Sequence, residues 1–247
     1  MKPVKEILGR VFALWGILVF TVSLLAISLP IWILGLWPEP KRTVYVFRIF
    51  KVWMDFFFFF SGVRRSFRGR ENFKKGENYI VVCNHNSFMD VPLSSPGIPG
   101  ANKTIAKVEM ARIPVFGLIY KRGSVLVDRK SEESRRNSFL RMREVLDQGL
   151  HMCIYPEGTR NKTSEPLQRF HDGAFKLAVE TGKSVIPTVI FGTLKVLPRK
   201  PFYFWPRKVH MHFLPPVTVA GKTTQQLKEE VFAIMKEYIV QNRPKLG

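Results

Sequence analysis

The first residues of this chain that could carry out proton transfer lie in the stretch VVCNHNSFMD, residues 81–90. His85 and Asp90 stand five positions apart, directly after an apolar run. A carboxylate beside an imidazole fixes the ring tautomer and stabilises its protonated form, so the pair could take a proton from an alcohol. The alternative is structural, because Ser87 with Asp90 three residues later resembles a helix capping box with Asp in place of Glu or Gln. The spacing alone leaves both interpretations open.

The elements that must position this pair can be read from the pattern after Gly62. Short apolar runs alternate there with longer amphipathic segments, which predicts an α/β fold with a central, mainly parallel sheet flanked by helices. We expect strands at 79–83, 103–107, 123–127, 151–155, 184–190 and 208–214. We expect helices near 87–95, 109–121, 131–148, 172–182 and 223–241.

Polar side chains follow each of the first four expected strands. Because the carboxyl ends of parallel strands meet at one edge, and that edge binds ligands in open α/β sheets, we expect these residues to form a site. Its basic members could hold a phosphate, with arginine offering a bidentate fork. The residues in question are His85, Asp90, Lys107, Glu109, Asp128, Arg129, Glu157, Gly158, Thr159 and Arg160.

The N-terminal part has a different character. Residues 11–37 carry no charge over 27 positions. A helix of that length is roughly 40 Å long, against about 30 Å for the hydrocarbon core of a bilayer. The run is too long for the apolar core of a signal peptide, so we expect a membrane segment. Pro30 is expected to kink or break it, giving either a tilted span or a helical hairpin that stays in one leaflet.

The next segment, residues 44–63, places Arg48, Lys51 and Asp55 on one side of a helix whose other positions are apolar or aromatic. This pattern favours a helix lying in the membrane interface over a helix packed on a soluble domain. We therefore divide the chain into membrane-binding helices, residues 1–62, and an α/β domain, residues 63–247. Basic residues after the uncharged run modestly outnumber those before it, which favours a cytoplasmic location for the α/β domain.

Composition narrows the possible partners. The formal net charge is +20, and most of it lies after residue 60. Such a balance suits nucleic acid, acidic lipid, a phosphorylated substrate or an acidic carrier protein. Cys83 and Cys153 are 70 residues apart in apolar runs, so we expect buried free thiols. His210 and His212 share a strand face but lack further ligands, and we predict no metal site.

Four blocks in this order resemble the glycerolipid acyltransferase family, most closely its bacterial 1-acyl-glycerol-3-phosphate members. They are NHNSFMD (84–90), AKVEMARIPVFGLIYKRGSVLVDR (106–129), YPEGTR (155–160) and SVIPTVI (184–190). The resemblance covers roughly residues 60–215. It implies that His85 is the catalytic base and Asp90 its partner. It also implies an acceptor site for glycerol and phosphate at Lys107, Arg129, Glu157, Gly158, Thr159 and Arg160.

The resemblance further implies a reaction. A fatty acyl group would pass from an acyl thioester, either acyl-CoA or acyl carrier protein (acyl-ACP), to the sn-2 hydroxyl of lysophosphatidic acid. No cofactor is expected beyond that co-substrate. A nucleophile in a G-x-S-x-G setting is absent from the sequence, so we expect direct transfer without an acyl-enzyme. The expected location is the inner (cytoplasmic) membrane, with membrane lipids as partners and no nucleic acid.

Other interpretations remain open on the sequence alone. Within the enzyme class, the acceptor could be another lyso-lipid, such as a lysophospholipid with a headgroup or a lyso-ornithine lipid. A basic nucleic-acid-binding protein would show salt-sensitive binding to DNA or RNA, but would leave YPEGTR and the membrane segment without a purpose. A membrane scaffold with a dead site conflicts with the joint presence of His85, Asp90, Glu157 and Arg160.

Overall fold

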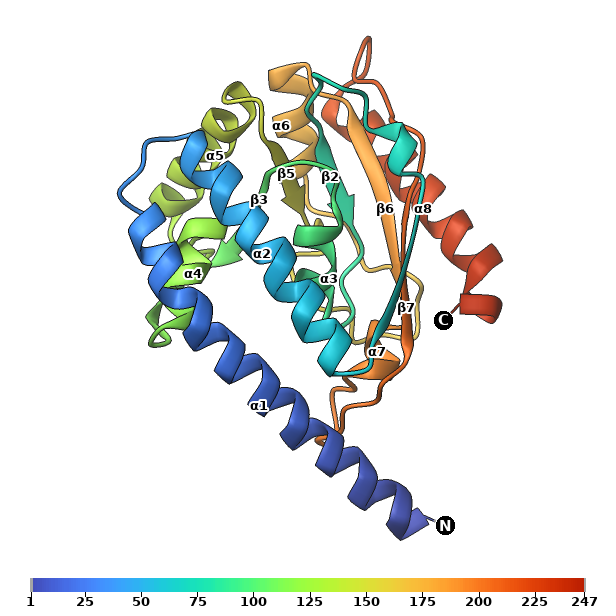
Figure 1. Ribbon diagram of the computed structural model, residues 1–247. Coiled ribbons are helices and arrows are strands. Elements are labelled where there is room, and N and C mark those ends of the chain that lie inside the picture. Colours follow the sequence, from blue (N-terminus) through green and yellow to red (C-terminus); the bar gives the residue numbers. More distant parts are fainter. Residues whose placement is uncertain (1, 247) are drawn as a thin grey trace.

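The computed structural model describes residues 2–246 and has one seven-stranded sheet between two layers of helices (Figure 1). The strands are Arg64–Arg68 (β1), Ile80–Cys83 (β2), Asn102–Lys107 (β3), Ser124–Val127 (β4), His151–Ile154 (β5), Val185–Phe191 (β6) and Lys208–Phe213 (β7). The helices are Lys2–Leu34 (α1), Lys41–Phe60 (α2), Asp90–Gly97 (α3), Phe116–Gly123 (α4), Glu132–Asp147 (α5), Gly173–Thr181 (α6), Thr193–Val196 (α7) and Thr224–Leu246 (α8).

The strand order is β1-β7-β6-β2-β5-β3-β4. Neighbours are parallel except β6 and β7, which are antiparallel. The expected α/β fold with a mainly parallel sheet is therefore confirmed. Strands β1 and β7 run against the other five, so they begin at the edge where those five end.

The central strands are buried on both faces, and their residues alternate between two cores. Val81 and Cys83 of β2 belong to the core that includes residues of α1, α2 and α3. Ile80 and Val82 belong to the opposite core, which includes residues of α5, α6 and α8. The odd-numbered side chains of β2 therefore face the N-terminal helices.

Helix α1 packs on the rest of the molecule along most of its length. Its inward positions start with the small residues Gly9, Ala13 and Gly16 and continue through Val19 and Ser23 to Ile31. A Cβ added to Gly9 would approach Tyr203 and Trp205 within 2.9 Å. At Ser23 the hydroxyl accepts a hydrogen bond from the Trp53 indole at 2.9 Å. The helix is thus a packed element rather than a detached anchor.

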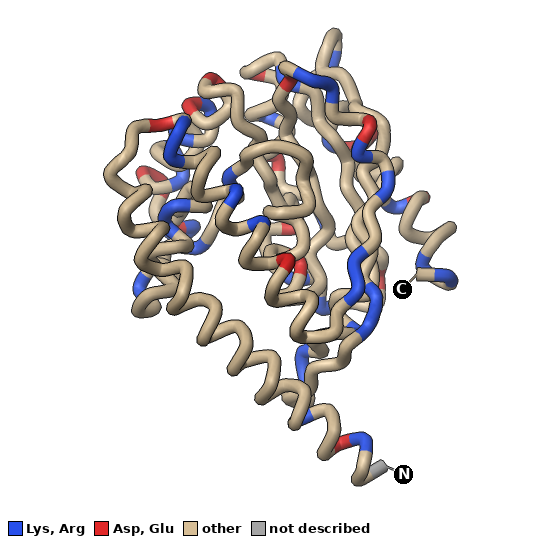
Figure 2. Tube along the Cα trace, in the orientation of Figure 1, with Lys and Arg blue, Asp and Glu red and all other residues tan. Residues whose placement is uncertain are grey.

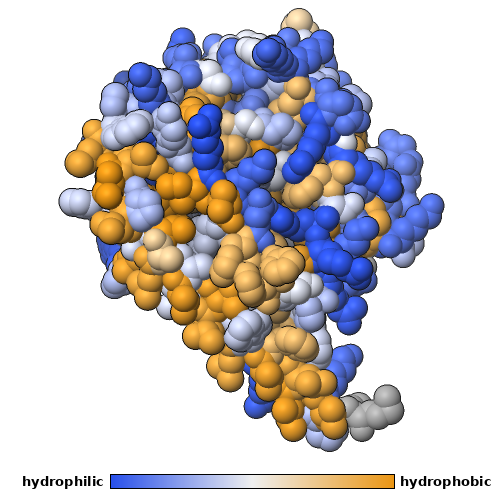
Figure 3. Space-filling model, in the orientation of Figure 1, coloured by the Kyte–Doolittle hydropathy of each residue, from blue (hydrophilic) through white to orange (hydrophobic). Residues whose placement is uncertain are grey.

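The outward side of α1 is apolar and exposed, as the continuous orange surface in Figure 3 shows. Among the described residues, Pro3–Leu34 is the helix that is long and apolar enough to cross a membrane. An exposed apolar surface of this extent indicates membrane association.

Pro30 was expected to kink or break this helix, and the break does not occur, because α1 continues to Leu34. A proline removes one backbone hydrogen bond. Here its ring is exposed near the end of the helix, while Ile31 beside it is fully buried. Packing on either side of Pro30 therefore holds the helix together. A hairpin still forms, because α1 and α2 are joined by residues 35–40 and pack on each other.

Helix α2 is less membrane-like than its sequence indicated. Trp53, Met54, Phe57 and Phe58 are buried in the core shared with the sheet. The exposed side combines the charged positions with Val52, Phe56, Phe59 and Phe60. The interpretation as a helix packed on the α/β domain is therefore correct for one side of α2. The boundary at residue 62 stays a prediction.

Three further differences have local causes. The expected helix at 109–121 is divided, because Pro114 and the positive φ of Val115 separate a 3₁₀ turn, Val108–Arg112, from α4. Strand β1 was not expected, since Arg64–Arg68 reads RRSFR and lies at the sheet edge with a mostly polar sequence. Helix α7 is a single short turn that leaves no periodic pattern.

The burial of His151 makes stability depend on pH. Its Nδ1 accepts a hydrogen bond from the backbone N–H of Tyr79 at 3.0 Å, and burial lowers its pKa from 6.5 to about 4. The unfolded chain binds this proton more readily, so stability is complete above about pH 6.5 and falls as the pH drops toward 4. We expect a loss of about 3 kcal/mol from this group.

Urea unfolding of wild type and His151→Asn at several pH values measures this effect. Asparagine keeps an acceptor for Tyr79 but does not titrate. The variant should be less stable at pH 7, since it loses packing against Phe73 and Tyr79, yet show a shallower decline between pH 6.5 and 4. Parallel declines in the two proteins would contradict the assignment.

Candidate active site

His85 lies just beyond the carboxyl end of β2. Its neighbour Asn84 extends the contact with β6, because the Asn84 amide donates to the carbonyl of Ile190 at 3.0 Å and its oxygen accepts the Ile190 N–H at 2.7 Å. This side-chain pairing continues the strand ladder for one more residue. His85 therefore starts from a fixed backbone position on the sheet edge.

The carboxylate of Asp90 is fully buried and organises the loop before it. Its Oδ2 lies 2.8 Å from Nδ1 of His85 and accepts the backbone N–H groups of Asn86 and Ser87 at 2.6 and 2.7 Å. The other oxygen, Oδ1, has no hydrogen-bond partner among residues 2–246. With Nδ1–H donating to the carboxylate, Nε2 of His85 is left as an acceptor. The ring is about 19% exposed, so Nε2 can meet a ligand.

The two interpretations of NHNSFMD turn out to be compatible. Asp90 reaches back to the N–H of Ser87, which is half of a capping box. In the other half, the Ser87 hydroxyl oxygen accepts the N–H of Met89 at 3.3 Å in place of that of Asp90, while the hydroxyl donates to the carbonyl of Leu197 at 3.0 Å. One carboxylate therefore closes the turn before α3 and holds the imidazole.

Glu157 holds the backbone of His85 through a hydrogen bond. It is only 3% exposed, and its two carboxylate oxygens accept the backbone N–H groups of His85 at 2.7 Å and Gln168 at 2.9 Å. Burial raises the pKa of this carboxyl group, and the two amide hydrogen bonds partly offset the effect. The resemblance implied that Glu157 contacts the acceptor. The geometry instead favours a role in positioning His85.

Tyr155 provides a second support. Its ring centroid lies 4.5 Å from that of His85 at an angle of 37°, and its hydroxyl is 2.7 Å from the hydroxyl of Ser94. Burial raises the pKa of Tyr155 well above 10. The phenol thus stays neutral and acts as a wall for the imidazole.

The expected phosphate-binding residues make different contacts. Arg160 lies over the ring of Phe88, with its guanidinium carbon 3.6 Å from the ring centroid, while Arg129 donates to the carbonyl of Gly158. Lys107 is exposed and pairs with Glu109 at 3.0 Å. Arg160 is thereby joined to the His85 loop through Phe88, and Arg129 to the loop after β5.

Gly158 and Thr159 shape that second loop. Gly158 has φ of +70°, a conformation that favours glycine, and a Cβ there would approach His171 within 2.9 Å. Thr159 is exposed. The carbonyl of His85 accepts the N–H of Asn161 at 2.7 Å, which ties this loop to the histidine.

The arrangement brings together an imidazole with a free Nε2 and two arginines at one edge of the sheet. Such a set can remove a proton from a hydroxyl while an anionic group on the same molecule is held by cations. No group of three or more potential metal ligands occurs among the described residues.

Comparison with known proteins identifies the family of this chain. A family model described as "Acyltransferase" matches residues 64–191. The chain belongs to this acyltransferase family. The matched region begins at β1 and ends at β6, so it contains His85, Asp90, Arg129, Glu157 and Arg160.

Individual relatives are similar over most of the chain. The 1-acyl-sn-glycerol-3-phosphate acyltransferase of Borreliella burgdorferi is 27% identical, over 73% of this acyltransferase and 72% of the relative. The human 1-acyl-sn-glycerol-3-phosphate acyltransferase alpha is 29% identical, over 74% of this chain and 65% of the relative. The crystal structure of the Thermotoga maritima enzyme PlsC, a 1-acyl-sn-glycerophosphate acyltransferase, has a TM-score of 0.84 and 24% identity, covering 98% and 99% of the two chains.

Four residues that contribute to the candidate site were not predicted from the sequence. Asn84, Phe88 and Tyr155 are letters of the quoted motifs, but nothing in the motifs shows that they anchor the strand, support Arg160 or pack on His85. Asn161 acts through its backbone, which no side-chain pattern reveals.

Glu157→Gln tests the positioning role. The new amide N–H₂ would face one backbone donor, so we expect a loss of about 1–3 kcal/mol in stability and a fall in kcat. The KM for the acceptor should change little, because Glu157 lies under His85. Steady-state kinetics and thermal melting measure both quantities, with the exposed Glu165→Gln as the control. A large rise in acceptor KM with unchanged kcat would instead place Glu157 on the substrate.

Proposed function

We propose that this protein transfers a fatty acyl group from an acyl thioester to the sn-2 hydroxyl of 1-acyl-glycerol-3-phosphate, forming phosphatidic acid. The observation that carries the proposal is the hydrogen bond of 2.8 Å between Nδ1 of His85 and Asp90 at the sheet edge that also holds Arg129 and Arg160. The similarity to proteins named as acyltransferases for this acceptor supports the choice of substrate.

His85 acts as the general base in this reaction. Nε2 takes the proton of the acceptor hydroxyl as its oxygen attacks the thioester carbonyl carbon. The carbon–sulfur bond then breaks, and the imidazolium returns the proton to the departing thiolate. Asp90 holds the ring tautomer throughout and stabilises the transient imidazolium.

The transfer is direct. The only two cysteines, Cys83 and Cys153, are fully buried and 3.9 Å apart at sulfur, which agrees with the expected free thiols. Burial raises the pKa of the Cys83 thiol well above 9, so it is a poor nucleophile. Acylation of either sulfur would require β2 and β5, which carry the two cysteines, to separate from the core around them.

Arg160 and Arg129 bind the acceptor phosphate. Arg160 is held flat by the Phe88 ring, which leaves the edge of its guanidinium free to donate. Lys107, at the end of β3, and the exposed Thr159 extend the same polar rim. The thioester, whether acyl-CoA or acyl-ACP, is a negatively charged donor that the basic surface attracts.

The membrane delivers the acceptor. His85 follows Val81 and Cys83, which face the core shared with α1 and α2, so the catalytic imidazole lies on the side of the apolar helices. Because α1 is packed against the domain from Gly9 to Ile31, it lies in one leaflet rather than crossing the bilayer. We place the protein on the cytoplasmic side of the inner membrane.

His85→Ala should lower acyl transfer by about 10²–10⁴-fold, the usual contribution of a general base. The assay is mass spectrometry of lipids after incubation with acyl thioester and a panel of acceptors that includes lysophosphatidic acid, lysophospholipids and lyso-ornithine lipid. His210→Ala, a histidine on β7, is the control. Equal formation of phosphatidic acid by wild type and His85→Ala would remove His85 from the mechanism. Preference for another acceptor would overturn the proposed substrate.

Arg160→Gln should raise the KM for lysophosphatidic acid by roughly tenfold to 100-fold, since a hydrogen bond to a charged group contributes about 1.5–3 kcal/mol. Phe88→Leu removes the ring beneath the guanidinium and should give a smaller rise. Arg136→Gln, on the exposed side of α5, serves as the charge-matched control. Initial rates over a range of acceptor concentrations give the KM of each variant. An unchanged KM in Arg160→Gln would exclude a contact between Arg160 and the acceptor phosphate.

A further inference from the structure

A second anionic site is suggested by a groove of about 440 Å³ that opens where β1 and β7 begin. In strand order, β6 and β7 separate β1 from β2, whose end carries His85. The groove opens at the same edge of the sheet as the candidate active site but shares no lining residue with it. Its basic lining residues are Arg64, Lys195, Arg207, Lys208 and Lys245.

The charges of this groove are not compensated by the protein. No Asp or Glu lines it, and none of the five basic side chains forms an ion pair with another residue in the range 2–246. All five are exposed. Figure 2 shows Lys and Arg gathered at this end of β1 and β7. Like charges held close together repel one another, so the arrangement is complementary to an external anion.

The groove is built on regular structure. Arg64 and Lys208 are register partners of the parallel pair β1 and β7, and the N–H of Arg64 donates to the carbonyl of Arg207 at 3.2 Å. The N–H of Trp205 donates to the carbonyl of Val196 at 2.8 Å. The backbone that carries these cations is thus fixed by the sheet and by α7.

A second groove of about 560 Å³ adjoins the basic one and shares Arg64 and Lys208 with it. Its lining also includes Phe59, which is 77% exposed, and Phe67. The one carboxylate there, Asp55, is paired with Arg65 at 2.7 Å. An anion-binding groove beside exposed aromatic side chains fits an amphiphilic ligand.

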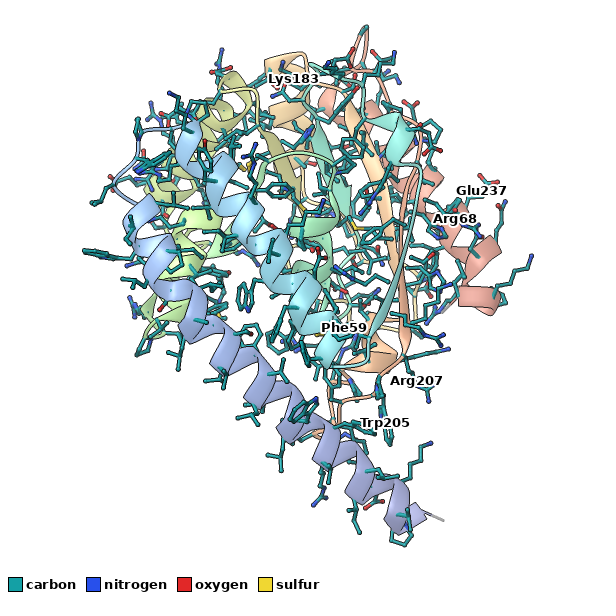
Figure 4. The ribbon with its side chains drawn as sticks, viewed as in Figure 1. Phe59, Arg68, Lys183, Trp205, Arg207 and Glu237 are labelled. Atoms are coloured by element: carbon teal, nitrogen blue, oxygen red, sulfur yellow. The ribbon has the colours of Figure 1, made fainter. Side chains whose placement is uncertain are left out.

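The surroundings favour a membrane lipid as that ligand. The basic groove is also lined by Phe12 of α1 and by Trp205, next to the exposed apolar side of α1. Figure 4 shows Trp205, Arg207 and Phe59 at the same end of the molecule, with Lys183 at the opposite end. Aromatic rings and basic side chains placed together beside an apolar helix are typical of the headgroup level of a bilayer.

We propose that these two grooves form a lipid site, separate from the acyl-transfer site, that binds the phosphate of an anionic membrane phospholipid. Arg64, Arg207 and Lys208 hold the phosphate, and the acyl chains lie along Phe59 and α1. The site fixes the orientation of the protein on the bilayer. It shares with the proposed function only the membrane location of α1.

Vesicle binding tests this site. Cosedimentation compares phosphatidylcholine vesicles with vesicles in which about a third of the lipid is phosphatidylglycerol. The test variant is Arg64→Gln with Arg207→Gln and Lys208→Gln. The control removes three charges from the opposite end of the sheet, by Lys74→Gln, Lys75→Gln and Lys183→Gln. The vesicle assay contains no acyl donor, so failure of the proposed acyl transfer does not affect its result.

Wild type should bind the anionic vesicles more tightly than the neutral ones. The groove variant should lose about tenfold or more of that preference, while the control keeps it within about twofold. Equal losses in the two variants would show a general surface charge and overturn the site. A groove variant that keeps full vesicle binding but shows a raised KM for acyl thioester would assign the groove to the donor, which also overturns the proposal.

Folding is controlled separately. Arg207→Gln alone changes one exposed loop residue and should reduce the anionic preference by about threefold to fivefold, with an unchanged melting temperature. Arg64→Lys with Arg207→Lys keeps the charge and should bind as wild type does. Loss of binding in this charge-conserving pair at an unchanged melting temperature would contradict recognition by charge.

Discussion

A carboxylate that water cannot reach determines the conformation of the loop that carries His85, and the neighbouring strands depend on that loop. Asp90 is fully buried, and burying such a group without donors is costly, so the chain must supply them. It does so with two backbone N–H groups and the His85 ring on a single oxygen. The loop between β2 and α3 can hardly take another shape while those three donors converge. The geometry of the imidazole is therefore a result of satisfying a buried acid.

The same constraint extends across the sheet. The backbone of His85 is held by Glu157 from the loop after β5, and the residue before it by Ile190 in β6. The first link joins residues that are 72 positions apart in the chain, and the second joins residues that are 106 positions apart. A shift in register of either neighbouring strand would move the base relative to the arginines. The parallel order β6-β2-β5 thus positions the candidate site, because it brings these links to one edge.

The sequence predicts the fold more completely than it predicts the candidate site. Strands β2, β5 and β6 follow from their apolar runs, because burial on both faces leaves a strong local signal. Strand β1 leaves no such signal, since RRSFR is an edge strand that pairs only with β7. The pairing of His85 with Asp90 could be predicted from the sequence, because the two residues are five positions apart. The role of Glu157 could not be predicted, because its partners are the backbone amides of His85 and Gln168, which only the tertiary structure brings to it.

The small residues on the inward side of α1 have a consequence for attempts to solubilise the enzyme. Gly9 and Gly16 let the helix approach the 203–205 segment closely, and Ala13, Val19, Leu24 and Ile31 complete the core on that side. Deleting the helix would uncover the aromatic rings beneath it and expose apolar core residues to solvent. A detergent-free form is better sought by redesigning the outward row of α1 with polar residues, which keeps the lining of the core in place.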